Sequence, residues 1–180
     1  MILTGHQIAE EAATGRIRIT PFDLARCTTN SYDLTLGRRL AVYRPGQVLD
    51  PRLEPNVEYR EIPDTGHLLE PGAFVLGETA EQLGSDTFVP IMHAKSGFAR
   101  RGVFAHITAD LFDLGFFGHS TLQLYATLPT LLLPGMPLAQ VTFWTTYGEI
   151  TDLYNGKYQG GDGPLPSRSH LDPWAVDARG

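Results

Sequence analysis

Glycine and proline break this 180-residue chain into short segments, and that punctuation is the strongest constraint on its fold. The chain has 19 glycines and 13 prolines, which is well above average usage. The apolar runs between these breaks suit strands joined by turns better than the long helices of a bundle. Aromatic and β-branched residues occur along the whole length, so a disordered chain is not expected. The pattern predicts one mainly β domain.

Residues 4–15 are the exception, because they predict a short N-terminal helix. Thr4 and Gln7 fit a capping box, and Gly15 fits the position at which helices stop. Beyond the helix, apolar and polar residues alternate as they do in strands. Strands are predicted over 31–36, 40–43, 73–79, 103–109, 120–126 and 138–144, with one or two helical turns over 95–101.

Charge and cysteine content exclude several functional classes. The net charge of −6 disfavours a long nucleic-acid groove, although a few clustered bases still suffice for a phosphorylated small molecule. Cys27 is the single cysteine, so neither an internal disulfide nor a Cys-rich zinc cage is expected. The longest apolar runs are too short to span a bilayer. With no signal-peptide pattern at the start, a cytoplasmic protein is the expectation.

Two polar segments are candidates for chemistry. Residues 94–102 hold Lys95, Ser96 and two arginines among small residues, which would suit a phosphate or a solvated turn. Residues 110–118 hold Asp110 and Asp113 in a loop rich in glycine and aromatic residues. An acid there could position a water or bind a sugar hydroxyl, and it could equally form an Asx turn.

The six histidines form no metal-ligand pattern. The chain has no His-x-x-x-His, no Cys-x-x-Cys and no His-x-Glu, so the zinc deaminase signature is absent. It also has no Walker loop, dinucleotide fingerprint or Gly-x-Ser-x-Gly. Any hydrolysis is therefore expected to proceed without protein-bound zinc, and no metal-ligating residue is predicted.

Glycine and proline crowd the segment after Tyr154. Composition alone suggests a floppy tail, and a tail that folds over a ligand is the alternative. No linker divides the chain, so residues 1–170 are predicted to form a single domain. Residues 171–180 are predicted to be a flexible tail.

Seven segments, taken in order, resemble the dCTP deaminase and dUTPase family, and its deaminase branch in particular. One of them, Lys-Ser-Gly-Phe-Ala-Arg-Arg-Gly at 95–102, is similar to the family's Arg-Ser-Ser-x-Ala-Arg-x-Gly. The others are 30–37, 68–79, 106–109, 113–118, 133–140 and 157–168. The resemblance implies a distorted β-barrel of the dUTPase-like β-clip type, and a homotrimer with sites shared between subunits. It also implies a pyrimidine deoxynucleoside triphosphate with Mg²⁺ carried on its phosphates. Residues 154–170 would then be a lid.

The family's functional residues carry over by position. Ser96 would touch the reacting water and the phosphates, Arg100 would organise the site, and Asp113 would hold the 3′-hydroxyl or activate a water. Lys95 stands where the family often has an arginine on phosphate, so the charge is kept and the bidentate fork is lost. The remaining implied substrate-binding residues are His106, Thr108, Ala109, Gln140, Tyr154, Lys157 and Gln159.

Three positions depart from the family pattern. Gln123 stands where the family has the glutamate that takes a proton from water, and an amide cannot do so at neutral pH. Leu111 replaces an arginine, and Gly97 replaces a second serine.

Three functions follow from these residues. The first is zinc-independent hydrolytic deamination of dCTP to dUTP, which Gln123 opposes. The second is a dUTP or dCTP diphosphatase in which Asp113 activates water. The third is a nucleotide-binding or regulatory homologue without chemistry.

Overall fold

The computed structural model describes residues 1–178, and most of its regular structure is strand. The helices are α1 (Gly5–Ala13), α2 (Ser96–Ala99) and α3 (Pro173–Asp177), with 3₁₀ turns η1 (Leu24–Arg26) and η2 (Ser169–Leu171). The strands are β1 (Ile17–Thr20), β2 (Tyr32–Leu34), β3 (Arg39–Tyr43), β4 (Val57–Glu61), β5 (His67–Leu69), β6 (Phe74–Ser85), β7 (Phe88–Ala94), β8 (Val103–Phe104), β9 (Phe117–Ala126), β10 (Thr130–Leu132) and β11 (Ala139–Thr145). The mainly β prediction is confirmed.

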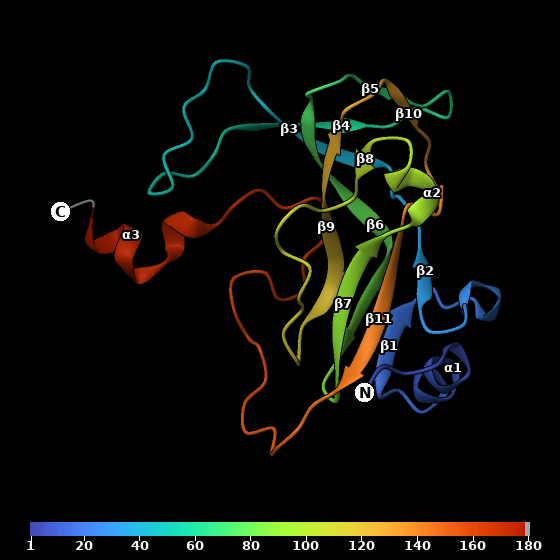
Figure 1. Ribbon diagram of the computed structural model, residues 1–180. Helices are drawn as coiled ribbons and strands as arrows, with labels where there is room; N and C mark the ends of the chain where they lie inside the picture. The colour runs from blue at the N-terminus through green and yellow to red at the C-terminus, as the bar shows by residue number, and fades with distance from the viewer. Residues whose placement is uncertain (179–180) are drawn as a thin grey trace.

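The long antiparallel pair β6 and β9 is the centre of the molecule (Figure 1). β6 pairs with β9 along one edge and with β3 and β1 in turn along the other. With β4 and β8 at its ends, this sheet has six strands. A second sheet runs in the order β2-β11-β7, and β5 pairs with β10 in a third. The described strands therefore form three sheets rather than the closed ring that a barrel requires.

Side-chain alternation in β9 separates the core from the opposite face. The buried positions of β9 include Leu122 and Leu124, which belong to the hydrophobic core. His119, Thr121 and Gln123 point the other way and are only half-buried. This second face of β9 is where a ligand can be reached.

The N-terminal helix forms as the sequence predicts. Thr4 is its N-cap, and its hydroxyl accepts the backbone N–H of Gln7 at 3.2 Å. The Gln7 side chain donates to Glu11 instead of returning to Thr4, so only half of the capping box is made. Ile8 is fully buried and fixes the helix to the core.

The predicted strand over 103–109 is too long, because β8 ends at Phe104. Beyond it the backbone leaves the ladder and bonds to side chains. The N–H of Ile107 donates to the Gln123 side chain at 3.2 Å, and His106 Nε2 lies 2.9 Å from the Met92 carbonyl oxygen. This irregular loop borders the site described below. The sequence also did not predict β1, β4 or β10.

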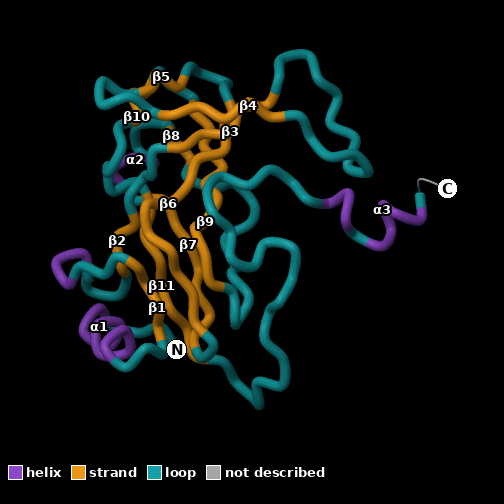
Figure 2. Tube along the Cα trace, turned by 180° about the vertical axis from the view of Figure 1, so that it is seen from behind, coloured by secondary structure: helices purple, strands orange, loops and turns teal. Residues whose placement is uncertain are grey.

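The C-terminal segment leaves β11, returns past β9 and ends away from the sheets (Figures 1 and 2). The expected flexible tail, 171–180, contains α3 within its described part. Residues 179–180 lie outside the described residues. Ser169 of η2 donates to the Pro51 carbonyl at 2.8 Å, so this arm contacts the loop between β3 and β4.

Candidate functional site

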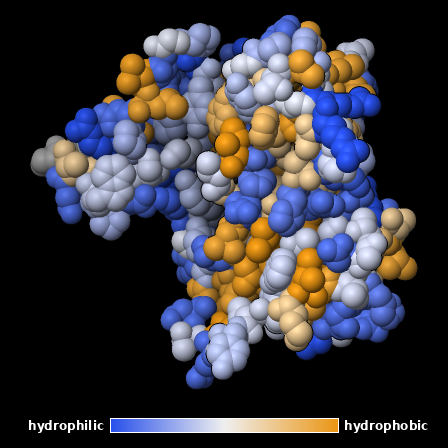
Figure 3. All heavy atoms as spheres, in the orientation of Figure 1, coloured by the Kyte–Doolittle hydropathy of each residue, from blue (hydrophilic) through white to orange (hydrophobic). Residues whose placement is uncertain are grey.

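A cavity of about 580 Å³ opens against the half-buried face of β9, a volume within the range of small-molecule sites. The loop after β8 and the C-terminal segment form its sides. Figure 3 shows apolar side chains gathered over the middle of the molecule, where β7 and β9 lie in Figure 1. The lining residues are Tyr43, Phe74, Leu76, Ala109, Leu111, Phe112, Asp113, Phe116, His119, Ser120, Thr121, Gln123, Tyr154, Lys157, Tyr158, Leu165 and Ser167.

Five of the predicted site residues meet in this cavity. Asp113 is exposed in the loop before β9, and the Gln123 side chain is held by its bond from Ile107 N–H. Ala109 lines the cavity near the same loop, and Tyr154 and Lys157 reach it from the C-terminal segment. The structure therefore brings together residues up to 48 positions apart in the chain, as a ligand site requires.

The C-terminal segment is fixed along β9 by backbone bonds. Gly160 N–H donates to the Phe117 carbonyl at 3.0 Å, and His119 N–H donates to the Gly161 carbonyl at 2.9 Å. Gly118 permits this approach, because a Cβ there would lie 2.7 Å from Gly161 N. The segment predicted as a lid lies against the cavity, and its opening and closing stay a prediction.

Gln159 braces this segment and does not line the cavity. Its amide donates to the carbonyls of Gly115 and Tyr154 at 2.8 and 3.1 Å and accepts Phe117 N–H at 2.8 Å. Lys157 is the cation that does line the cavity, and it forms an ion pair with Asp172. The predicted contact of Gln159 with phosphate therefore needs a rearrangement of these bonds.

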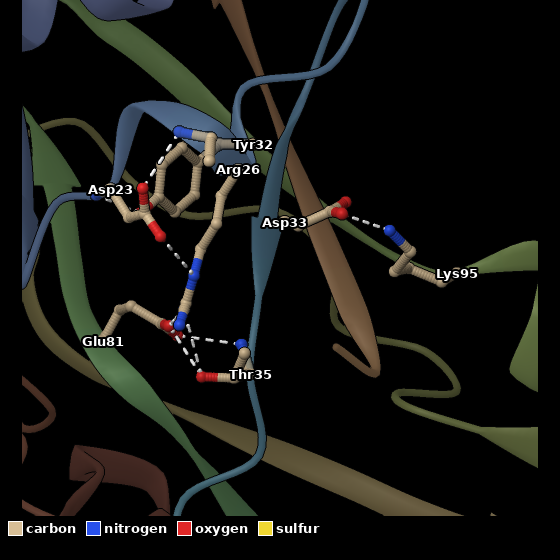
Figure 4. Close-up of polar contacts among 8 residues, drawn as sticks. Asp23, Arg26, Tyr32, Asp33, Thr35, Glu81 and Lys95 are labelled. Atoms are coloured by element: carbon tan, nitrogen blue, oxygen red, sulfur yellow. Dashed lines mark hydrogen bonds and ion pairs between the residues drawn. The ribbon is translucent and has the colours of Figure 1, made fainter. Parts of the chain in front are cut away.

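A second group of predicted residues lies apart, around the sheet β2-β11-β7. Lys95 forms an ion pair with Asp33 of β2 (Figure 4), and Gln140 of β11 accepts the Ser31 hydroxyl at 3.2 Å. Ser96 is the first residue of the short helix α2, Arg100 is its C-cap, and both are exposed. None of these four predicted residues lines the cavity, and neither do His106 and Thr108. Within one chain, the predicted site is therefore in two parts.

A buried ionic network lies next to the strand that carries Asp33, the ion-pair partner of Lys95 (Figure 4). Glu81 of β6 is almost fully buried and accepts the backbone N–H and the hydroxyl of Thr35 at 2.9 and 2.7 Å. Arg26 of η1 completes the carboxylate's partners and also faces Asp23 at 3.6 Å. Asp33 lies two residues before Thr35, so this network fixes the strand that carries the partner of Lys95.

Aromatic rings form two walls of the cavity, and of these rings the sequence predicted Tyr154 but not the others. Tyr43 stacks on Phe74 with ring centroids 6.2 Å apart, and Phe116 contacts both Phe112 and Tyr154 at 5.6 and 6.2 Å. Burial raises the pKa of Tyr43. Such rings suit an apolar or planar ligand group. No local signal marks them, because strand pairing and the C-terminal segment bring them together.

An arginine links the C-terminal segment to the central sheet. Arg39 of β3 forms ion pairs with buried Glu78 at 2.8 Å and with Asp162 at 2.7 Å. These hydrogen bonds raise the pKa of Arg39, and the guanidinium lowers the pKa of Asp162. The segment is thereby tied to β3 and β6 as well as to β9.

No group of three or more His, Cys, Asp or Glu side chains within residues 1–178 is arranged to hold a metal ion. No helix in the same part of the chain is long and apolar enough to cross a membrane.

Comparison with known proteins shows the family. A family model described as dCTP deaminase-like matches residues 2–146. The chain is 38% identical over 173 residues to a Clostridium botulinum (strain Eklund 17B / Type B) protein named "dCTP deaminase, dUMP-forming", covering 96% of this chain and 98% of the relative. A Leptospira biflexa (strain Patoc 1 / Ames) protein of the same name is 38% identical over 172 residues, with the same coverage. The chain therefore belongs to the dCTP deaminase-like family, which confirms the expected class of nucleotide hydrolase.

A solved structure confirms the fold. The crystal structure of 2′-deoxycytidine 5′-triphosphate deaminase from Agrobacterium tumefaciens matches with a TM-score of 0.64 at 20% identity. The match covers 81% of this chain and 48% of that chain.

Proposed function

We propose that this protein converts dCTP to dUMP, releasing ammonia and pyrophosphate with the consumption of two waters. The sequence predicts dUTP as the product of deamination, and the relatives named dUMP-forming at 38% identity favour dUMP instead. The observation that carries the proposal is the cavity on β9. It unites Asp113 and Gln123 with Tyr154 and Lys157 of the C-terminal segment.

Each of these side chains suits one part of a nucleotide. Asp113 is an acceptor for the 3′-hydroxyl of the deoxyribose, and Lys157 supplies positive charge for phosphate once it leaves Asp172. Rings such as Phe116 and Tyr154 offer surface to the planar base. Mg²⁺ would be carried on the phosphate oxygens, which are hard ligands that this ion prefers.

We further propose that the site is completed by a neighbouring subunit of a homotrimer. Lys95, Ser96, Arg100 and Gln140 are the phosphate-side residues that the resemblance implies, and they lie outside the cavity of their own chain. A symmetric assembly would bring this group from one subunit to the cavity of the next. The Lys95–Asp33 ion pair would then open or reorient to admit phosphate.

Gln123 decides how fast the deamination step runs. Its side-chain oxygen already accepts Ile107 N–H, so its NH₂ group is the free end and can donate to the base. An amide binds the pyrimidine yet cannot take a proton from water. A diphosphatase that acts on dUTP or dCTP without deamination is the second candidate, because Gln123 does not hinder attack on phosphorus.

One assay separates the candidates. The protein is incubated with dCTP or dUTP and Mg²⁺, and ammonia and pyrophosphate are followed separately. Ammonia together with pyrophosphate from dCTP is the expected result. Pyrophosphate without ammonia would replace the proposal by the diphosphatase. Absence of both products, with nucleotide binding by calorimetry, would leave a binding homologue.

The first testable prediction concerns Gln123→Glu. A carboxylate at this position restores a proton acceptor, so ammonia release from dCTP should rise by about 10²–10⁴-fold. Gln47→Glu, in the loop between β3 and β4 and outside the cavity, is the control for the added charge. Unchanged ammonia release from the Gln123 variant would show that this pocket no longer uses the family's proton transfer.

A further inference from the structure

His119 lies in the cavity, although nothing in the sequence pattern assigned it a role. It is on β9, on the same face as Thr121 and Gln123, and its ring is half-buried. A residue four positions along a strand is about 13 Å away. His119 and Gln123 therefore face different parts of any nucleotide that fills the cavity.

A β-bulge fixes the ring of His119. Glu78 pairs with Thr121 and Gln82 pairs with His119, so three residues of β6 stand opposite one residue of β9. The bulge frees the Thr79 carbonyl from the ladder, and this oxygen lies 2.8 Å from His119 Nδ1. Because a carbonyl only accepts, Nδ1 carries the hydrogen. In the neutral ring Nε2 is therefore left with a lone pair and has no hydrogen-bond partner among residues 1–178.

The same bulge leaves a second polar group unused. Ser120 lines the cavity and is 2% exposed, and its hydroxyl has no hydrogen-bond partner in the described part of the chain. Its backbone N–H donates to the Thr79 hydroxyl at 2.9 Å, so the backbone is satisfied and the side chain is not. A buried hydroxyl without a partner in the lining of a cavity is expected where a ligand supplies the missing bond.

The charged groups on the elements around the cavity come from the C-terminal segment, β3, β6 and the cavity lining itself. Asp162 of the C-terminal segment interacts with it electrostatically, and Arg39 of β3 partly neutralises Asp162 while also pairing with Glu78 of β6. Within the cavity, the acid is Asp113 and the cation is Lys157, and the remaining ionisable lining groups are Tyr43, Tyr154 and Tyr158.

We propose that His119 Nε2 is the proton acceptor for the water that attacks the α-phosphorus, an inference that rests on the proposed function. The water oxygen forms a bond to phosphorus while one of its protons passes to Nε2. The bond from that phosphorus to the bridging oxygen breaks, and pyrophosphate leaves with the electron pair. Asp113 is then free to hold the sugar, and the base is left to the Gln123 end of the strand.

The test uses dUTP, because pyrophosphate release from dUTP does not depend on deamination. His119→Gln keeps a donor for the Thr79 carbonyl and removes the proton acceptor. It should lower kcat by about 10²–10⁴-fold with little change in KM. The wild-type kcat should fall as the pH is lowered through the range in which histidine titrates, and the variant should lose this fall. His67→Gln, on β5 and outside the cavity, is the control.

A second variant keeps the test independent of folding. His119→Ala should regain part of its pyrophosphate release when imidazole is added, which a purely structural role does not predict. A His119→Gln variant with wild-type kcat and an unchanged pH profile would overturn the inference, and so would a folded His119→Ala variant without rescue. Ammonia release from dCTP by the wild type is scored separately and tests the proposed deamination alone. A wild type that releases neither product would overturn both.

Discussion

Two buried carboxylates on β6 illustrate how single residues set this structure. Glu78 and Glu81 are 4% and 1% exposed, and burial of an unpaired carboxylate would be costly. Each therefore has its own arginine, Arg39 for Glu78 and Arg26 for Glu81. The bulge between Glu78 and Gln82 lies among these pairs, so the carboxylates fix the local backbone that holds His119.

Glu81→Gln should destabilise the protein, because the amide cannot satisfy Arg26 and the two Thr35 donors equally. Loss of hydrogen bonds to a charged group predicts a decrease of about 1.5–3 kcal/mol in the free energy of unfolding, measured by urea denaturation at fixed protein concentration. Glu58→Gln, which breaks the exposed pair with Arg60, should change it by less than about 0.5 kcal/mol. Equal midpoints and slopes for the two variants would contradict the structural role of Glu81.

At the scale of elements, the C-terminal segment is attached to the sheets by hydrogen bonds and by an exposed ion pair. Its bonds to β9 involve backbone at 160–161, and its ionic contact is Asp162 with Arg39. Asp162 is 75% exposed, so this pair alone is worth little and is screened by salt. A lid has to leave and return, and this movement of the segment stays a prediction.

Asp162→Asn should loosen this segment. KM for the nucleotide is expected to rise about two- to fivefold with kcat nearly unchanged, and limited proteolysis of the segment should quicken. Because Arg39 lowers the pKa of Asp162, the contact contributes fully above the carboxyl's ordinary value of about 4 and is lost as pH falls through the lowered value. Asp64→Asn breaks an exposed pair with Arg38 and is the control. If the variant keeps the wild-type KM and the wild-type rate of proteolysis, Asp162 has no role in holding the segment against the cavity.

At the scale of the whole molecule, the family's residues lie in two separate groups. Asp113 and Gln123 belong to the cavity on β9, whereas Ser96 and Gln140 belong to the region around β2-β11-β7. Within residues 1–178 of one chain the two groups do not line the same cavity, and the proposed homotrimer with shared sites would bring them to one ligand.

Mixing two inactive variants tests this assembly. Asp113→Asn and Ser96→Ala should each lose most pyrophosphate release, and trimers reassembled from an equal mixture should regain about a quarter of wild-type activity, because each shared site takes one group from each of two subunits. Light scattering checks that both variants and the mixture have the mass of three chains. If the mixture is no more active than either variant measured alone, each complete site lies within one subunit.

Part of the fold and of the site could be predicted from the sequence. Thr4 and Gly15 predicted the two ends of α1, because helix capping depends on residues close in sequence. The alternation of apolar and polar residues over 120–126 predicted β9. The strand predicted over 103–109 failed after Phe104, where Gln123, a residue distant in sequence, takes the Ile107 N–H. The same alternation on β9 could have placed His119 on the same face of the strand as Gln123. Its importance was hidden because the Thr79 carbonyl that orients it is freed by a bulge.

The sequence by itself determined the mainly β character and the family, because turn residues, alternation and motifs act over short distances along the chain. Only the tertiary structure decided which motif residues share a cavity, where the C-terminal segment lies, and that His119 presents a free Nε2. Those facts depend on strand pairing and on a bulge between residues some 40 positions apart. Contacts of that kind are set by the packing of the whole core rather than by local preference.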